Sequence, residues 1–328
     1  MAKAAAIKDE DAYRWFLKAR WPSTKGVPVC PACGVIGATA IRRRRFRCTA
    51  IECRREFSVT SGTILASRKL SFRRSVLAIA LSVLSVKGLA ACHLKRELTV
   101  DYKTAFVLSH KLREAVAAER EHMKLEGTVE MDAMHLGGHV RPENKAEDRV
   151  DGRHAENQTG KRMAVQALRE RGPGNRTLAV AVPGERGDIA WHLTRNHVAH
   201  GAELRADQHP AYDELGGLGN LVRNDHTKAY VVERDASTNQ AESLFSRMRR
   251  AEIGIFHRMS GKYLDWYAAD IAWREDMRRI DYRRQAKSML ASAMKHGVSP
   301  NMCGYWQRRD KAKEVLVGWN PLRGLPSL

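Results

Sequence analysis

Thr128-Val-Glu-Met-Asp-Ala-Met-His-Leu136 is the segment on which the fold prediction depends most, and Gly137 and Gly138 follow it directly. It predicts a β-strand that the two glycines close. Two more strands are expected downstream, at residues 163–168 and 177–182, and the Gly-Pro-Gly sequence at 172–174 predicts that they form a hairpin. This part of the chain therefore begins with three consecutive strands.

A helix, a fourth strand and a late helix complete this pattern. Asp188 is a good N-cap for a helix that runs to about residue 198. A short strand is expected at residues 204–207, and a long helix begins around Asn239. Three consecutive strands, a crossover helix, another strand and a final helix follow one another in the order of a ribonuclease-H-like domain.

Three carboxylates lie on this framework. Asp132 is in the first strand, Asp207 ends the fourth strand, and Glu242 is on the late helix. In the predicted fold the first and fourth strands are neighbours and the late helix packs over them, so the three acids meet. Like charges at such short range repel one another, and two Mg²⁺ or Mn²⁺ ions would resolve that conflict. The sequence therefore predicts metal-dependent hydrolysis and transesterification of phosphodiesters.

Other polar residues near these acids are candidates for the same site. Glu130 is the rival of the first acid, since it lies two residues before it on the same strand face, and Asp213 is a weaker rival of the second. Asn239, one helical turn before the third acid, is either a neutral metal ligand or the cap of its helix. Arg249 and His226 are expected to contact a substrate phosphate.

Upstream, two close pairs of cysteines predict a zinc ribbon. Cys30 and Cys33 enclose two residues, Cys48 and Cys53 enclose four, and fourteen residues separate the pairs. Two such pairs on two turns converge on one tetrahedral Zn²⁺, and four protein ligands leave no position open for catalysis. The zinc is therefore expected to be structural.

The segment between the cysteine pairs is strongly basic. Five of its residues are arginines around one aromatic residue, Phe46, namely Arg42, Arg43, Arg44, Arg45 and Arg47. On a ribbon strand such a run would follow a phosphate backbone. The alternative is a solvated basic surface, since arginines on an exposed face need no specific partner. The first four arginines are our candidates for substrate contact.

Between the ribbon and the α/β region the apolar pattern is helical. Three helices are expected, at residues 72–86, 89–98 and 102–118, each with one buried stripe. The short break at residues 99–101 makes the last two similar to a helix-turn-helix, whose second helix enters a major groove of DNA. An ordinary three-helix bundle gives the same pattern. A helix-turn-helix would bring three basic side chains close to DNA: Lys103, Lys111 and Arg113.

The composition indicates a folded protein with a polyanionic partner. The chain has 328 residues, of which 43% are apolar and 29% charged, and its net charge is +20. These values exclude a mostly disordered, collagenous or membrane-embedded chain, and such a surplus is typical of nucleic-acid-binding proteins. The longest apolar stretch, residues 76–86, is too short to cross a bilayer. Acidic residues at 9–11 replace the apolar core of a signal peptide, so we expect a cytoplasmic protein with reduced cysteines.

Together these motifs resemble those of the ISXO-like insertion-sequence transposases, which are bacterial zinc-ribbon members of the DDE (acidic-triad) transposase superfamily. The resemblance covers about residues 15–280. It depends on the order and spacing of six segments: the ribbon, residues 57–63, residues 89–112, Glu130-Met-Asp132 with the two glycines after its strand, Ala206-Asp207-Gln-His-Pro-Ala-Tyr212, and Ser237-Thr-Asn239-Gln-Ala-Glu242-Ser.

The resemblance implies cutting and joining at the terminal inverted repeats of a mobile element, with divalent metal and in a multimeric synaptic complex on the bacterial nucleoid. It matches Asp132 and Asp207 to the two aspartates of the family. Asn239 and Glu242 both match the third acidic motif, so either residue completes the metal site. The chain departs from the family pattern next to the acids, at residues 133–135 and 208–209.

We therefore divide the chain into four regions: an N-terminal helix and zinc ribbon at 1–62, a helix-turn-helix-like DNA-binding region at 63–122, a ribonuclease-H-like catalytic domain at 123–285 and a basic C-terminal extension at 286–328. The leading hypothesis is a homo-oligomeric DNA transposase with structural Zn²⁺ and catalytic Mg²⁺ or Mn²⁺, which binds terminal inverted repeats and target DNA. The alternatives are a non-catalytic DNA-binding regulator derived from a transposase and a stand-alone nuclease of the same fold.

Overall fold

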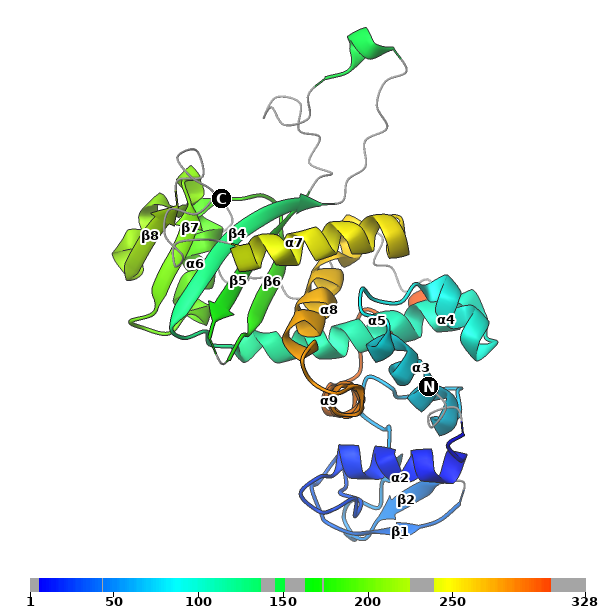
Figure 1. Ribbon diagram of the computed structural model, residues 1–328. Coiled ribbons are helices and arrows are strands. Elements are labelled where there is room, and N and C mark those ends of the chain that lie inside the picture. Colours follow the sequence, from blue (N-terminus) through cyan, green and yellow to red (C-terminus); the bar gives the residue numbers. More distant parts are fainter. Residues whose placement is uncertain are drawn as a thin grey trace. The chain divides into compact units, whose positions relative to one another are not determined.

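The computed structural model describes residues 6–42, 44–136, 145–150, 163–172, 174–224 and 239–307 of the chain. These residues form two compact units, an N-terminal unit of residues 6–118 and 277–307 and a second unit of residues 119–276 (Figure 1). Arg43, Gly137, Gly138 and His226 lie outside the described residues, as does the predicted extension beyond residue 307. None of the described helices is long and apolar enough to span a membrane.

The N-terminal unit begins with a helix and a small antiparallel sheet. Its elements are α2 (Asp9–Arg20), β1 (Ala38–Ala40), β2 (Arg45–Cys48) and β3 (Glu56–Ser58), and the strand order is β1-β2-β3. The rings of Trp21, Phe46 and Phe57 form an aromatic cluster with centroids 5.7 to 6.3 Å apart. Strands this short bury little apolar surface, so the sheet depends on these rings and on its cysteines.

Three helices follow the ribbon close to the positions that the apolar pattern predicts. They are α3 (Phe72–Leu84), α4 (Ala91–Leu98) and α5 (Tyr102–Ala118). Ser71 caps α3, because its Oγ accepts a hydrogen bond from the amide of Arg74 (3.2 Å). Thr99 follows α4 in the left-handed region (φ 50°), a conformation that ends helices. The predicted break between the last two helices is therefore a turn.

The three basic residues that we expected near DNA differ in their surroundings. Arg113 of α5 is buried and donates a hydrogen bond to the carbonyl oxygen of Leu89 (3.1 Å). Lys111 is half-buried, whereas Lys103 is exposed and its Nζ lies 5.3 Å from the ring centre of Trp306. The expectation is wrong for Arg113, because a buried guanidinium that holds a loop of its own unit does not reach a phosphate.

A helix from late in the sequence completes the N-terminal unit. Asp281 caps α9 (Tyr282–Lys295) by accepting hydrogen bonds from the amides of Arg283 (3.0 Å) and Arg284 (3.1 Å). One face of α9 is buried, and the helix contacts α2, α3 and α5; its buried apolar residues are Met289, Leu290, Ala293 and Met294. The chain thus returns to its N-terminal unit after the second unit is complete.

The second unit is built on a five-stranded sheet with the strand order β6-β5-β4-β7-β8. The strands β4 (Thr128–Leu136), β5 (Met163–Arg171) and β6 (Thr177–Val182) are antiparallel neighbours, whereas β7 (Glu203–Asp207) and β8 (Asn220–Asn224) run parallel to β4. The predicted first strand, hairpin and fourth strand are confirmed. β8 is a further strand that was not expected from the sequence.

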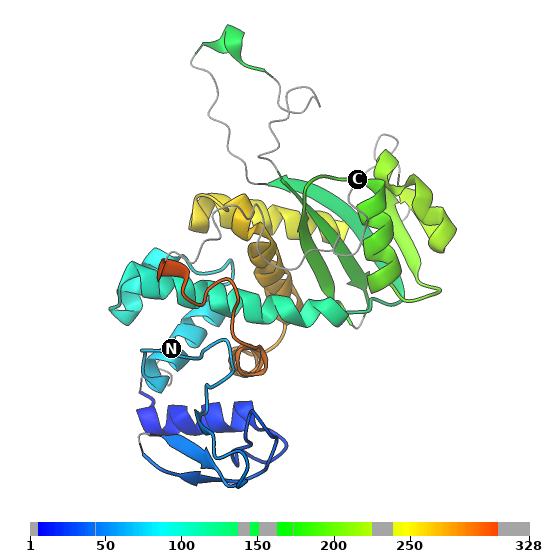
Figure 2. The ribbon, with the colours of Figure 1, turned by 180° about the vertical axis from the view of Figure 1, so that it is seen from behind.

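Helices cover both faces of this sheet (Figures 1 and 2). On one face α6 (Gly187–His197) packs in a core that includes Met131 of β4. On the other face α7 (Asn239–Ala251) and α8 (Leu264–Met277) pack in a core that includes Met134. Because side chains alternate along a strand, the two acids of β4 lie on the face of α7 and α8.

A buried ion pair fastens α8 to β6. The guanidinium of Arg120 bonds the carboxylate of Asp265, and the two side chains are 4% and 0% exposed. Asp265 also accepts a hydrogen bond from the amide of Ala181 in β6 (3.2 Å). We expect Arg120→Leu to destabilise the protein by about 3–5 kcal/mol, because it leaves the carboxylate buried without its partner. Urea denaturation measures this loss.

The double variant Arg120→Leu/Asp265→Leu is the companion measurement. It removes the buried charge as well as its partner, so part of the lost stability should return. An equal loss in the single and double variants would mean that packing, and not the unpaired charge, causes the effect.

Candidate functional site

The four predicted zinc ligands come together in the N-terminal unit. The Sγ atoms of Cys30, Cys33, Cys48 and Cys53 all lie within 4.8 Å of one another, with 3.8 Å between Cys30 and Cys53 and 3.4 Å between Cys33 and Cys48. Four sulfurs placed tetrahedrally around zinc, each about 2.3 Å from it, stand about 3.8 Å apart. The cluster therefore has the size and the donor set of a structural zinc site.

The basic run between the cysteine pairs is partly used inside the protein. Arg44 is half-buried and bonds two acids of α2, at 2.6 and 3.0 Å. Arg45 is exposed and lies 3.7 Å from Glu56 of β3, and Arg42 is also exposed. Arg44 thus fastens the ribbon to its helix. Of the four candidate arginines, Arg42 and Arg45 are the described ones whose side chains face solvent.

Asp132 and Asp207 occupy adjacent positions on neighbouring strands. The parallel register pairs Met131 with Ala206, and each of these residues precedes one of the aspartates. Met131 and Ala206 belong to the core on the α6 face, so both aspartates are on the α7 face. One oxygen of each is already held by a backbone amide: Ala133 donates to Asp132 (2.7 Å) and His209 donates to Asp207 (3.0 Å).

Glu242 brings a third carboxylate from another element. It lies in the first turn of α7 and is exposed. The pKa of Asp132 is raised to about 7, mainly because the half-buried side chain loses hydration and further because Asp207, Glu185 and Glu242 carry negative charge. The charges of Asp207 and Glu242 therefore both act on Asp132, although the three acids come from three separate elements of the fold.

These carboxylates are spaced more widely than the cysteines. Within the described part of the chain, the cysteine cluster is the only set of three or more His, Cys, Asp or Glu groups whose ligand atoms all lie within 4.8 Å of one another. The acids are thus not gathered around one point. Carboxylate oxygens are the ligands that Mg²⁺ and Mn²⁺ prefer, and two such ions about 4 Å apart need ligands on both sides.

Glu185 is a fourth acid of this group, and no sequence motif indicated it. It follows β6, its Oε1 accepts a hydrogen bond from the hydroxyl of Tyr212 (2.7 Å), and the same oxygen lies 3.7 Å from Nδ1 of His209. Because β4 and β6 are both antiparallel to β5, they run in the same direction and end at the same edge of the sheet. Strand direction is the signal that could have located Glu185.

The two rival acids have partners elsewhere. Glu130 is fully buried, and its Oε2 accepts hydrogen bonds from the amides of Gln240 (2.9 Å) and Ala241 (3.0 Å). Asp213 forms an ion pair with Arg223 at 2.7 Å. The carboxylate of Glu130 is therefore directed at the backbone of α7, and that of Asp213 at a neighbouring guanidinium.

The remaining predicted residues lie on α7 or outside the described chain. Asn239 is the first residue of α7 and is exposed, and the amides that follow it bond Glu130 and not an asparagine cap. Arg249 is exposed in the last turn of the same helix. His226 falls outside the described residues.

Two families of known domains match the chain. The transposase zinc-ribbon domain matches residues 7–56, which include all four clustered cysteines, and the ISXO2-like transposase domain matches residues 124–276, which include the five-stranded sheet and the acids. No curated protein and no solved structure matches the chain. A zinc ribbon ahead of an α/β transposase domain defines an insertion-sequence transposase. The chain belongs to the ISXO2-like family of these transposases, as its motifs indicated.

Proposed function

We propose that this protein binds the terminal inverted repeats of its own insertion sequence and catalyses metal-dependent cleavage and transfer of DNA strands. The observation that carries the proposal is the adjacent placement of Asp132 on β4 and Asp207 on β7, with the charge of Glu242 on α7 acting on the half-buried Asp132. A group of carboxylates is unfavourable by itself, and its presence supports a site for cations. We assign Asp132, Asp207 and Glu242 to that site.

The topology of the second unit supports the same conclusion. Three antiparallel strands, a crossover through α6, and two further strands parallel to β4 form the arrangement that we expect of a ribonuclease-H-like domain. β4 and β7 are neighbours and α7 packs on the sheet. This is the juxtaposition that the three acids need.

The donor set fits divalent cations of the Mg²⁺ or Mn²⁺ type. When bound, such ions activate a water or a 3′-hydroxyl and stabilise the leaving oxygen. The protein itself prepares the carboxylates, because the amides of Ala133 and His209 each hold one oxygen of an aspartate and leave its second oxygen for a ligand. Burial of Asp132 weakens its hydration, which favours exchange of water for a cation.

We assign the third ligand to Glu242 and not to Asn239. The charge of Glu242 acts on Asp132, and a carboxylate offsets more of the positive charge of two cations than a neutral amide does. Glu185 supplies a further negative charge at the same edge of the sheet. Its hydrogen bond from Tyr212, which itself accepts one from Gln166 (3.0 Å), fixes its orientation.

The N-terminal unit carries the DNA-binding surface in this proposal. α4 and α5 are two helices around a short turn at Thr99, which supports our assignment of a helix-turn-helix to this region. Lys103 is exposed in the first turn of α5, where a recognition helix contacts base edges or phosphates. The exposed arginines Arg42 and Arg45 of the ribbon would add phosphate contacts.

A strand-transfer assay tests the proposal against its two alternatives. The protein is incubated with Mg²⁺, a labelled duplex that carries the terminal repeat, and a target plasmid. A transposase nicks the repeat end and joins it to the plasmid, a regulator binds without cleavage, and a nuclease yields only hydrolysed ends. Binding without metal-dependent nicking would overturn the catalytic assignment. Crosslinking in the same reaction tests the homo-oligomer that a synaptic complex requires.

Affinity for the repeat is expected to fall steeply with salt. With six to ten phosphate contacts, the association constant should drop about 10³- to 10⁵-fold between about 50 and 200 mM salt. Fluorescence anisotropy measures the slope of log K against log salt. Arg42→Ala should reduce that slope by about one. Arg44→Ala is the matched control and should leave it unchanged, because Arg44 bonds Asp9 and Glu10; a flat response in the wild type would contradict the prediction.

A further inference from the structure

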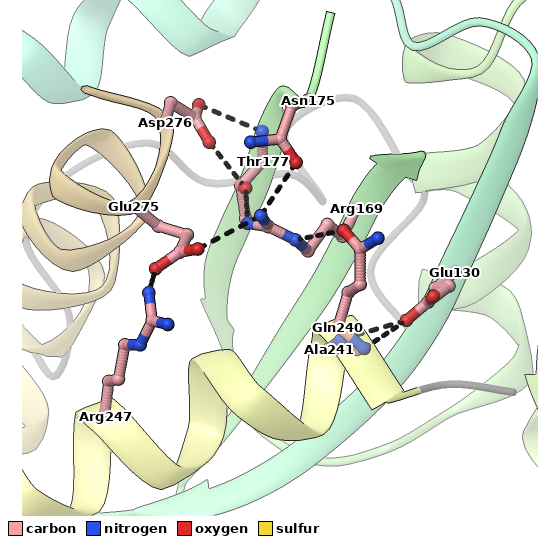
Figure 3. Close-up of polar contacts among 9 residues, drawn as sticks. All are labelled: Glu130, Arg169, Asn175, Thr177, Gln240, Ala241, Arg247, Glu275 and Asp276. Atoms are coloured by element: carbon pink, nitrogen blue, oxygen red, sulfur yellow. Dashed lines mark hydrogen bonds and ion pairs between the residues drawn. The ribbon is translucent and has the colours of Figure 1, made fainter. Parts of the chain in front are cut away.

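Glu130 ties the N-terminus of α7 to β4 (Figure 3). One oxygen of its buried carboxylate accepts hydrogen bonds from the amides of Gln240 (2.9 Å) and Ala241 (3.0 Å), and the other pairs with Arg171. Amides in the first turn have no partner within their own helix, and the helix dipole favours negative charge there. Glu130 therefore caps α7 from a strand that is distant in the sequence.

Arg169 holds the same end of α7 through a side chain (Figure 3). Its Nε donates to Oε1 of Gln240 (3.0 Å), and its Nη atoms donate to Thr177 of β6 (2.7 Å) and Glu275 of α8 (3.1 Å). Glu275 also pairs with Arg247, further along α7. The part of α7 that carries the third acid is therefore fixed on both sides of that acid.

The anchor and the first acid share one strand. Glu130 and Asp132 lie on the same face of β4, two residues and so about 7 Å apart along the strand. Glu242 directly follows Ala241, whose amide bonds Glu130. Glu130 thus helps to set the separation between the carboxylates of Asp132 and Glu242, because a displacement of α7 along the sheet would move Glu242 and leave Asp132 in place.

We propose that Glu130 is a positioning residue for the acid site, which acts on bound cations only through the placement of Glu242. This inference rests on the proposed function. Partners that orient metal ligands change metal affinity or activity about 10- to 100-fold when they are replaced. In Glu130→Gln the side-chain NH₂ group would face another donor, either an amide of α7 or the guanidinium of Arg171. In Glu130→Asp the side chain is one methylene too short to reach both α7 and Arg171.

Binding of Mn²⁺ followed by electron paramagnetic resonance tests this role without DNA or turnover, because the signal of the free ion disappears on binding. Glu130→Gln and Glu130→Asp should each weaken Mn²⁺ binding about 10-fold or more. The Mn²⁺ concentration for half-maximal nicking should rise by the same factor, with the KM for DNA unchanged. A role in stability alone would lower the melting temperature and leave both metal readings at their wild-type values.

Glu170→Gln is the matched control. Glu170 is also a buried acid of this sheet, and it pairs with Arg176 at 2.6 Å. It follows Arg169 in β5, so it lies on the opposite face from α7. This variant should lose stability and keep the wild-type affinity for Mn²⁺. Affinities within about twofold of wild type in both Glu130 variants would overturn the proposal, whatever their melting temperatures.

Asp132→Asn distinguishes failure of this inference from failure of the proposed function. If that variant binds Mn²⁺ as tightly as the wild type, the acid site itself is wrong. If it loses Mn²⁺ while both Glu130 variants keep it, only the positioning role is wrong. Should Glu130→Gln fail to fold, Glu130→Asp decides, because it keeps the negative charge opposite Arg171.

Discussion

The variant Asp132→Asn is expected to nick a terminal-repeat duplex about a thousandfold more slowly than the wild type, or not at all, and yet to melt at a higher temperature when no divalent metal is added. The rate falls because a lost ligand removes several kcal/mol of transition-state stabilisation. The melting temperature rises because asparagine fills a similar volume without placing a charge beside Asp207, Glu185 and Glu242. Activity and stability should thus change in opposite directions.

The stabilisation of the folded protein by Asp132→Asn should grow as the pH rises. The pKa of Asp132 is about 7 in the folded protein and near its ordinary value of 3.8 in the unfolded chain. The folded state therefore binds more protons than the unfolded state between these values, and wild-type stability falls as the pH rises through this window. About three pKa units correspond to about 4 kcal/mol above pH 7. Thermal melts at about pH 5.5 and pH 8 should show the larger gap between variant and wild type at pH 8.

Asp213→Asn is the matched control for this variant. Asp213 lies near Asp207 in the sequence but pairs with Arg223 at a largely exposed position. It should retain nicking and gain no stability at either pH. If Asp132→Asn nicks DNA at the wild-type rate, the acid has no part in the mechanism. If this variant melts at a lower temperature than the wild type at pH 8, the charge of Asp132 does not destabilise the folded protein.

Patterns that are local in the sequence predicted the framework of this protein. The strand of Thr128–Leu136 was predicted with its observed bounds, and the Gly-Pro-Gly turn identified the hairpin that follows it. On α7 the apolar residues that recur at helical spacing are buried, namely Ala241, Leu244, Phe245 and Met248. Periodicity works here because each element exposes one face to a core, whichever other element completes that core.

Partnerships between distant residues could not be predicted in this way. Glu130 and Asp132 are equivalent by spacing, and what separates them is a pair of amides on a helix about 110 positions later. Arg44 belongs to a run of arginines that predicts a DNA-binding surface, but its guanidinium bonds two acids of α2. Glu185 has no pattern of its own. Each of these roles depends on tertiary contacts, which local sequence patterns do not indicate.

The packing of α9 and the existence of β8 also could not be predicted from local sequence patterns. The buried stripe of α9 indicates that this helix packs against something, but only the structure shows that its partners are α2, α3 and α5. β8 was not predicted at all, because Asn220-Leu-Val-Arg-Asn224 is short and begins and ends with asparagine, a residue that strands disfavour. Hydrogen bonding to β7 stabilises this strand although its own sequence has a weak preference for β structure.

Replacing Cys48 with serine is expected to remove the zinc ion and to unfold the ribbon. The three strands of this sheet have 3, 4 and 3 residues, too few to be stable alone, whereas structural zinc supplies about 10–16 kcal/mol of folding free energy. Cys48 is buried at the end of β2 and lies 3.4 Å from Cys33. Zinc content, measured with a chelating dye after denaturation, should fall from about one to about zero per chain, and affinity for the terminal repeat should fall with it.

Cys92→Ser is the matched control, because Cys92 is an exposed thiol on α4 outside the cluster. It should keep both zinc and repeat binding. Retention of zinc by Cys48→Ser would mean that three thiols suffice, which contradicts a closed four-sulfur site. The acids lie in the other compact unit, so Cys48→Ser should still bind Mn²⁺ with wild-type affinity. Loss of Mn²⁺ together with zinc would show that the acid site depends on the ribbon, and would rule out a purely local role for the zinc.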